Sequence, residues 1–244
     1  MKLLDHFWHS GDFLFRWRSY FPVLLLPAFL MALADSPLGV GPGGWARAWQ
    51  MGCLLVSLSG LAVRVLTVGT APAGTSERST TDPRASTLTT TGTYSIVRHP
   101  LYLGNSLIVL GLACFPGAWY LPVMVVLASL LYHERIAARE ERFLEERFGD
   151  EFKRWADAVP ALMPSFARYQ PPTVTFRWQR VLGREFHALF VIGAGFFALD
   201  IGRRALLSGR LSFDPFWTAV VAVAGVVFVA LMAIKKSTTL LKAE

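Results

Sequence analysis

The sequence predicts an all-α, polytopic integral membrane protein with about six membrane helices, and three observations support this fold class. Of the 244 residues, 53% are hydrophobic and only 17% are charged, whereas an average soluble domain has about 25% charge. The mean hydropathy is +0.42. One membrane span needs about 20 apolar residues, and apolar segments occupy residues 20–34, 49–67, 101–131, 186–199 and 217–234.

The N-terminal third predicts an interfacial segment and two spans. Residues 1–20 mix aromatic side chains with His, Arg and Asp, as an amphipathic interfacial helix does. The first span, residues 20–34, is short and contains two prolines. In the second span, Arg64 is close enough to the end to reach the cytoplasmic interface. Residues 1–68 are the first expected unit of the chain.

The middle of the chain predicts a loop, a helical hairpin and a charged helix. Residues 69–93 are rich in Thr, Ser, Gly and Pro, and so long a loop is a lid or disordered. Residues 101–131 are too long for one span, and Pro116-Gly117 interrupts them, which indicates a hairpin. A charged helix with one apolar face follows over residues 132–158, with Gly149 as a candidate break. Residues 69–166 form the second expected unit.

Residues 167–244 are the third expected unit, a pair of membrane helices. Asp200 is spaced to pair with Arg203 and Arg204 at one helix end. Cys53 and Cys114 lie inside apolar segments, which indicates core positions and no disulfide. The five histidines also lack metal-ligand spacing, so no metal site is expected.

The net charge of +7 is dispersed between the spans. Basic residues between spans mark cytoplasmic loops, and this explanation is favoured over nucleic-acid binding. With the N-terminus inside, the loop 69–98 and the segment 132–185 face the cytoplasm, whereas Arg203, Arg204 and Arg210 fall outside as exceptions.

Two polar clusters bracket the hairpin. The first lies at its start, in Arg98-His99-Pro100-Leu101-Tyr102-Leu103-Gly104, and the second, with His133, Glu134, Glu140 and Glu141, follows its end. Ionisable groups at a membrane boundary are costly, so such clusters indicate a site. A solvated helix with pairs such as Arg142 and Glu146 is the alternative for the acidic residues. On the predicted orientation, both clusters face the cytoplasm.

These motifs resemble the isoprenylcysteine carboxyl methyltransferase and phospholipid methyltransferase superfamily over residues 60–166. The segment 92–104 carries the first part of the resemblance, and Glu140-Glu141-Arg142-Phe143-Leu144, Phe148-Gly149-Asp150-Glu151-Phe152 and Val159-Pro160 carry the second. The resemblance implies a membrane methyltransferase that uses S-adenosyl-L-methionine. It further implies that the cofactor is bound by Gly92, Tyr94, His99, Pro100, Tyr102, Leu103, Gly104, Glu140 and Glu141.

Arg98, as a clamp for the methyl acceptor, and Glu134, at a further acidic position of the phospholipid branch, are the candidate catalytic residues. Ala158 stands where the isoprenylcysteine branch has an arginine before Val-Pro, which disfavours a prenylcysteine acceptor. The expected reaction is therefore methylation of a membrane lipid headgroup, either a phosphate, as in lipid A, or a phospholipid amine. The nearby Arg78 and Arg84 would suit a phosphate.

Three alternatives stay open at this stage: a carboxyl methyltransferase of the isoprenylcysteine type, an NADPH-dependent sterol or enone reductase, and a non-enzymatic transporter or assembly factor. The expected partners are the bilayer and a lipid substrate, with no nucleic acid. The expected location is a bacterial inner membrane. The sequence leaves open the acceptor, the oligomeric state, the role of the last two helices, and which of Glu134, Glu140 and Glu141 contacts the cofactor.

Overall fold

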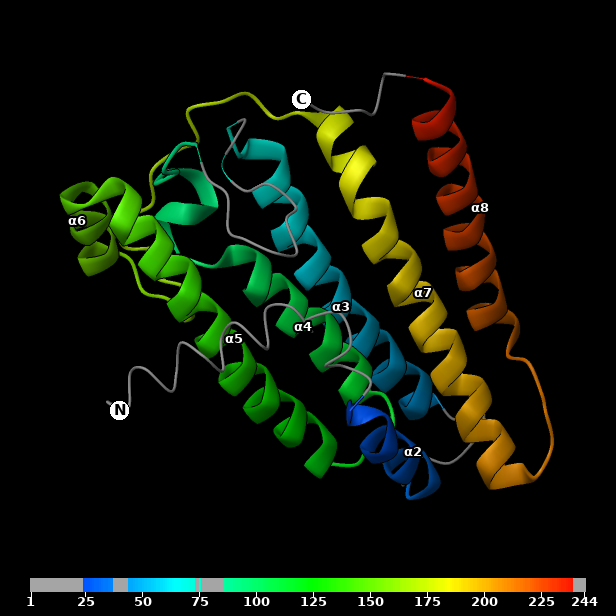
Figure 1. Cartoon of the computed structure of the whole chain (residues 1–244). Helices are drawn as coiled ribbons and strands as arrows, with labels where there is room; N and C mark the ends of the chain where they lie inside the picture. The colour runs from blue at the N-terminus through cyan, green and yellow to red at the C-terminus, as the bar shows by residue number, and fades with distance from the viewer. Residues whose placement is uncertain (1–23, 37–43, 73–74, 76–85, 239–244) are drawn as a thin grey trace.

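The computed structural model describes residues 24–36, 44–72, 75 and 86–238, which form seven α-helices and one 3₁₀-helix and no strand. The helices are α2 (Leu26–Ala34), α3 (Gly44–Thr70), η2 (Gly92–Ser95), α4 (Pro100–Cys114), α5 (Tyr120–Phe148), α6 (Asp150–Ala158), α7 (Trp178–Ser208) and α8 (Pro215–Ser237). In Figure 1, α3 and α4 lie in the middle, with α5 on one side and α7 and α8 on the other. The all-α prediction is confirmed. The predicted interfacial helix over residues 1–20 lies outside the described residues, as do Arg78 and Arg84.

Four of the described helices, α3, α5, α7 and α8, are long and apolar enough to cross a membrane. Among the described residues the number of candidate membrane helices is therefore four, and the predicted number of about six is too high there. At a rise of about 1.5 Å per residue, the nine residues of α2 and the fifteen of α4 are shorter than a hydrocarbon core of about 30 Å. Large apolar side chains such as Leu127 and Val226 are more than half exposed, as expected of surfaces that face lipid. The protein is a multi-pass membrane protein.

The predicted hairpin is present, but its two arms are unequal. α4 ends at Cys114, and the chain turns over Pro116 and Gly117, which has a φ of +80°. The second arm, α5, continues into the charged segment, so the second arm of the hairpin and the acidic helix are one continuous helix. Gly149, at φ +53°, ends α5 and starts α6, as predicted.

Small residues bring α3 and α4 into close contact. A Cβ atom at Gly104 would lie 2.8 Å from the carbonyl oxygen of Gly60 and 2.6 Å from the Cγ of Arg64. Ser57 also donates a hydrogen bond of 2.8 Å to the carbonyl of Ile108. Glycine and serine at a helix interface allow the backbones to approach, as is typical of packing in membranes. This contact fixes α4 against the long helix α3.

Side chains from α3, α4, α7 and α8 meet in an aromatic core. Phe115, Phe196 and Trp217 are fully buried, and the rings of Phe196 and Trp217 stack with centroids 5.1 Å apart. Cys53 belongs to the same core as a free thiol, as predicted. This core ties the last two helices to the hairpin.

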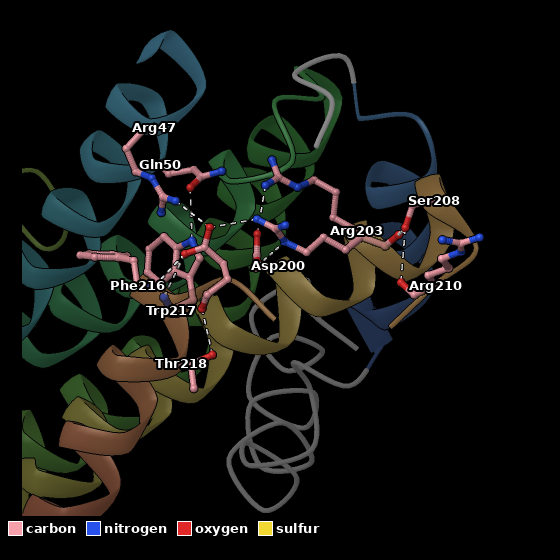
Figure 2. Close-up of polar contacts among 11 residues, drawn as sticks. Arg47, Gln50, Asp200, Arg203, Ser208, Arg210, Phe216, Trp217 and Thr218 are labelled. Atoms are coloured by element: carbon pink, nitrogen blue, oxygen red, sulfur yellow. Dashed lines mark hydrogen bonds and ion pairs between the residues drawn. The ribbon is translucent and has the colours of Figure 1, made fainter. Parts of the chain in front are cut away.

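An ion network closes the end of the bundle where α7 ends and α8 begins (Figure 2). Asp200, which is 1% exposed, pairs with Arg203 at 3.1 Å and with Arg204 at 2.8 Å, as the spacing predicts. Asp214 pairs with Arg204 at 2.9 Å and with Arg47 of α3 at 2.6 Å. The network joins α3, α7 and the start of α8 at the end of the bundle opposite the start of α4.

Candidate active site

The first turn of α4 positions two rings of the candidate site. Pro100 is the first residue of α4, and His99 is its N-cap with an extended φ of −120°. Proline keeps its predecessor out of the helical region, so the His99 side chain is set at a fixed angle to the helix. Tyr102 follows within the same turn, and the His99 and Tyr102 rings stack with centroids 5.4 Å apart. His99 is 8% exposed.

Two adjacent carboxylates of α5 face this turn. Tyr102 donates a hydrogen bond of 2.5 Å to Glu140 Oε1, and Glu141 Oε1 lies 2.8 Å from His99 Nε2. His99 Nδ1 is also 3.6 Å from Glu140 Oε2. The side chains of Glu140 and Glu141 are 28% and 23% exposed. The two clusters that bracket the hairpin in the sequence therefore form one cluster in space.

A third ring extends the cluster along α5. The His133 ring stacks on Tyr102 with centroids 4.9 Å apart, and Ser106 Oγ lies 3.2 Å from His133 Nδ1. His133 is buried. The sequence places His133 in the second polar cluster without assigning it a role, and Ser106 is not among the predicted site residues. The sequence spacing could have placed His133 in the site, because it precedes Glu140 by seven residues and so lies on the same helix face.

Arg98 joins the cluster to the end of α6. Its Nε lies 3.2 Å from Glu141 Oε1, and its Nη1 donates a hydrogen bond of 3.2 Å to the carbonyl of Ala156. Its backbone N–H donates to the carbonyl of Pro160. Arg98 thus balances part of the carboxylate charge and also holds the segment after α5 in place.

The 3₁₀-helix η2 covers one side of the cluster. Gly92 adopts a φ of +64° and donates its N–H to the carbonyl of Gln170. Tyr94 packs with Phe152 and Trp155, and Trp155 Nε1 donates to its carbonyl at 3.1 Å. Burial raises the pKa of the Tyr94 phenol, and the nearby Glu140 charge raises it further. Tyr94 therefore lies close to the acidic pair and stays protonated at neutral pH.

The remaining predicted residues have different surroundings. Glu134 is exposed on α5, because it is one residue past His133 and so lies about 100° around the helix from it. Leu103 is half-buried, and the buried Gly104 faces α3. No group of three or more His, Cys, Asp or Glu within the described ranges could hold a metal ion.

Taken together, the cluster offers two partly exposed carboxylates, one guanidinium and a column of three aromatic rings. Carboxylates accept hydrogen bonds from amino and hydroxyl groups and attract cations. Aromatic faces also attract cations. The arrangement therefore suits a cationic ligand that carries hydrogen-bond donors.

The comparison with known families identifies the region that holds this cluster. Residues 49–151 match the model of the phospholipid methyltransferase family. This part of the chain is therefore similar to the phospholipid methyltransferase family. The match includes α4, α5, the stacked rings of His99, Tyr102 and His133, and the carboxylates of Glu140 and Glu141. The match ends before α7 and α8.

Two curated relatives are bacterial metal-resistance proteins. The chain is 32% identical over 130 residues to the cobalt-zinc-cadmium resistance protein CzcN of Cupriavidus metallidurans. It is 30% identical over 132 residues to the nickel-cobalt-cadmium resistance protein NccN of Alcaligenes xylosoxydans xylosoxydans. Each alignment covers 53% of this chain, and the chain spans 58% and 59% of the length of these relatives. No solved structure matches the chain significantly.

Proposed function

We propose that the protein transfers a methyl group from S-adenosyl-L-methionine to a polar group of a membrane lipid, at the cytoplasmic face of a bacterial inner membrane. The observation that carries the proposal is the convergence of His99, Tyr102, Glu140 and Glu141 at one end of the hairpin. These residues lie inside the segment that matches the phospholipid methyltransferase family. Members of this family use S-adenosylmethionine.

The residues of the cluster fit this cofactor. Glu140 and Glu141 would accept hydrogen bonds from its amino and ribose hydroxyl groups, because both carboxylates remain about a quarter exposed. The rings of His99, Tyr102 and His133 would face its positive sulfonium. The cofactor supplies an activated methyl group, so the protein has to align the acceptor and exclude water. The buried rings suit the second task.

A lipid phosphate or amine is the favoured acceptor. Arg98 would hold a phosphate by charge-assisted hydrogen bonds, and it lies beside Glu141 in the cluster. A phosphate oxygen that attacks the methyl carbon is already an anion, so it needs no base. A protonated amine does need one, and the exposed Glu134 is the candidate for that role. Phosphates of the lipid A type and phospholipid amines both fit this chemistry.

The alternatives fit less well. A nicotinamide reductase has to bind a phosphate-rich cofactor, and the acidic pair Glu140-Glu141 would repel its phosphates. A carboxyl methyltransferase of the isoprenylcysteine type would have an arginine where Ala158 ends α6.

Lipid methylation would also account for the names of the relatives. Divalent cations collect at anionic membrane surfaces because of the surface potential. A methyl group on a lipid phosphate removes negative charge and so reduces this local accumulation. We infer that the reaction contributes to tolerance of divalent metals by changing the lipid and without binding the metal itself.

The direct test uses purified protein, methyl-labelled S-adenosylmethionine and a total bacterial lipid extract. Label should appear in the lipid fraction with the wild type and should be strongly reduced with Glu141→Ala. Label that never enters lipid, although the protein is folded, would contradict the proposal. The link to metals is tested separately, by comparing cadmium tolerance of cells that express the wild type or Glu141→Ala.

A further inference from the structure

A buried ion pair joins α3, near its C-terminal end, to α7, near its N-terminal end. Arg64 donates two hydrogen bonds to Glu185, from Nε at 2.7 Å and from Nη2 at 2.9 Å. The Arg64 side chain is 15% exposed and that of Glu185 is 4% exposed. This fork-like contact sets the plane of the guanidinium as well as its position. Glu185 lies beyond the segment that matches the methyltransferase family.

A buried ion pair contributes little net free energy to the packing of two helices. Removing two charges from water costs free energy, and apolar residues of similar volume often stabilise a fold as well or better. Ionisable residues within membrane helices are therefore functional candidates. The helices α3 and α7 also have an apolar interface near Cys53 and Ile192. Packing alone does not explain the ion pair.

The third hydrogen bond of Arg64 leads to the candidate site. Arg64 Nη1 donates to Asn105 Oδ1 at 2.6 Å. Because a guanidinium is only a donor, it fixes the Asn105 amide with its oxygen toward Arg64. The aliphatic stem of Arg64 lies against Gly104, where a Cβ atom would be only 2.6 Å from its Cγ. Arg64 therefore contacts two successive residues of α4, immediately after Tyr102 and Leu103.

The same short stretch of α4 carries the site. Tyr102, three residues before Asn105, donates to Glu140 and stacks on His133. Ser106, one residue after Asn105, lies 3.2 Å from His133 Nδ1. Residues three apart on a helix share a face, so a rotation or shift of α4 at Asn105 moves Tyr102 relative to Glu140. The hold that Arg64 exerts on α4 thus fixes the geometry of the rings and carboxylates.

We propose that Glu185 and Arg64 are positioning residues of the methyltransferase site. In this proposal α7 supplies, from outside the family segment, the carboxylate that orients Arg64, and Arg64 fixes the first turns of α4. This gives the C-terminal helices a role in the reaction besides membrane anchoring. The inference rests on the proposed function, because it assumes that the cluster binds the cofactor.

Removal of one partner does not test the proposal well. Glu185→Ala leaves an unpaired buried guanidinium, and the cost of that charge would destabilise the fold. The double variant Arg64→Met/Glu185→Leu avoids this problem, since it removes both charges and keeps similar volumes. The methionine also keeps an apolar stem near Gly104. This variant should fold but lose the hydrogen bond to Asn105.

The readout is the affinity for S-adenosylhomocysteine, measured by calorimetry with the full-length protein in nanodiscs, together with the thermal unfolding midpoint. The double variant should keep an unfolding midpoint near that of the wild type and bind about threefold or more weakly, because residues in one hydrogen-bond network are energetically coupled. Asn105→Ala should weaken binding similarly. Adding Asn105→Ala to the double variant should have little further effect.

Asp200→Asn is the matched control. It removes a charge from the buried network at the opposite end of the bundle, so it should lower the unfolding midpoint and leave S-adenosylhomocysteine affinity unchanged. Wild-type affinity in the double variant would overturn the positioning role alone. Absence of S-adenosylhomocysteine binding by the wild type would overturn the proposed function, and this inference with it.

Discussion

Replacement of Glu141 provides the most direct test of the candidate site. Glu141 Oε1 lies 2.8 Å from His99 Nε2 and 3.2 Å from Arg98 Nε, and these groups keep the carboxylate oriented at the cluster. A hydrogen bond to a charged group contributes about 1.5–3 kcal/mol. Because the side chain is 23% exposed, the lower end of this range applies. Glu141→Ala should therefore weaken S-adenosylhomocysteine binding about tenfold.

Isothermal titration calorimetry of the purified protein measures this change. Glu140→Ala and His99→Ala should show losses of similar size, since Glu140 pairs with Tyr102 and His99 lies between both carboxylates. Glu146→Gln is the matched control on the same helix, because Glu146 is 65% exposed and pairs with Arg142. Its affinity should be that of the wild type. Unchanged affinity in all three site variants would refute the assignment of the cofactor site.

Three further predictions concern the product, the packing and the pH dependence. Label transferred to lipid should remain after mild alkali that spares the headgroup, because N-methyl groups and phosphate methyl diesters resist it; release of the label as methanol would indicate a carboxyl methyl ester instead. Gly104→Ala should lower the unfolding midpoint, since its Cβ would lie 2.6 Å from Arg64 Cγ and 2.8 Å from the Gly60 oxygen, and overpacking costs about 1–3 kcal/mol. Gly52→Ala, with open space around its Cβ, is the control; equal midpoints would contradict the close contact of α3 and α4. Burial by itself would raise the pKa of Asp214, but hydrogen bonds from Arg47 and from the backbone of Phe216 and Trp217 hold it below its ordinary value of 3.8. The stabilisation is therefore present above that value and is lost as the pH falls through the lowered pKa. Asp214→Asn should reduce the unfolding midpoint at pH 7 but not at the acidic limit, and an equal reduction at both would rule out this account.

The sequence is a better guide to the cluster of ring and carboxylate residues than to the number of membrane spans. Arg98, His99 and Tyr102 precede an apolar segment, Glu140 and Glu141 follow it, and a hairpin between them can only bring the two ends together. The predicted number of spans is too high because hydropathy reports the length of an apolar segment of sequence. Whether that segment crosses the membrane depends on the length of each single helix within it. The apolar residues of α4 end at the turn after fifteen residues. The next residues, Phe115 to Trp119, are also mostly apolar but form the turn to α5.

Glu134 illustrates a second limit. Its spacing of seven from Glu141 indicates a common helix face, yet Glu134 is exposed and Glu141 contacts His99. At this height of α5 it is His133 that faces α4 and stacks on Tyr102, and Glu134 lies about 100° around the helix from it. Local periodicity carries no information about where the covering elements end.

By itself, the sequence determined the helical class, the membrane environment, the hairpin and the residue types of the cluster, because these depend on composition, on local breaks and on the short distance between hairpin ends. Only the tertiary structure decided which side chains meet across the chain. The pairing of Arg64 with Glu185, 121 residues apart, and the stacking of His133 on Tyr102 depend on the packing of whole helices. The position and rotation of each helix are set by all of its neighbours at once, so no local pattern in the sequence encodes them.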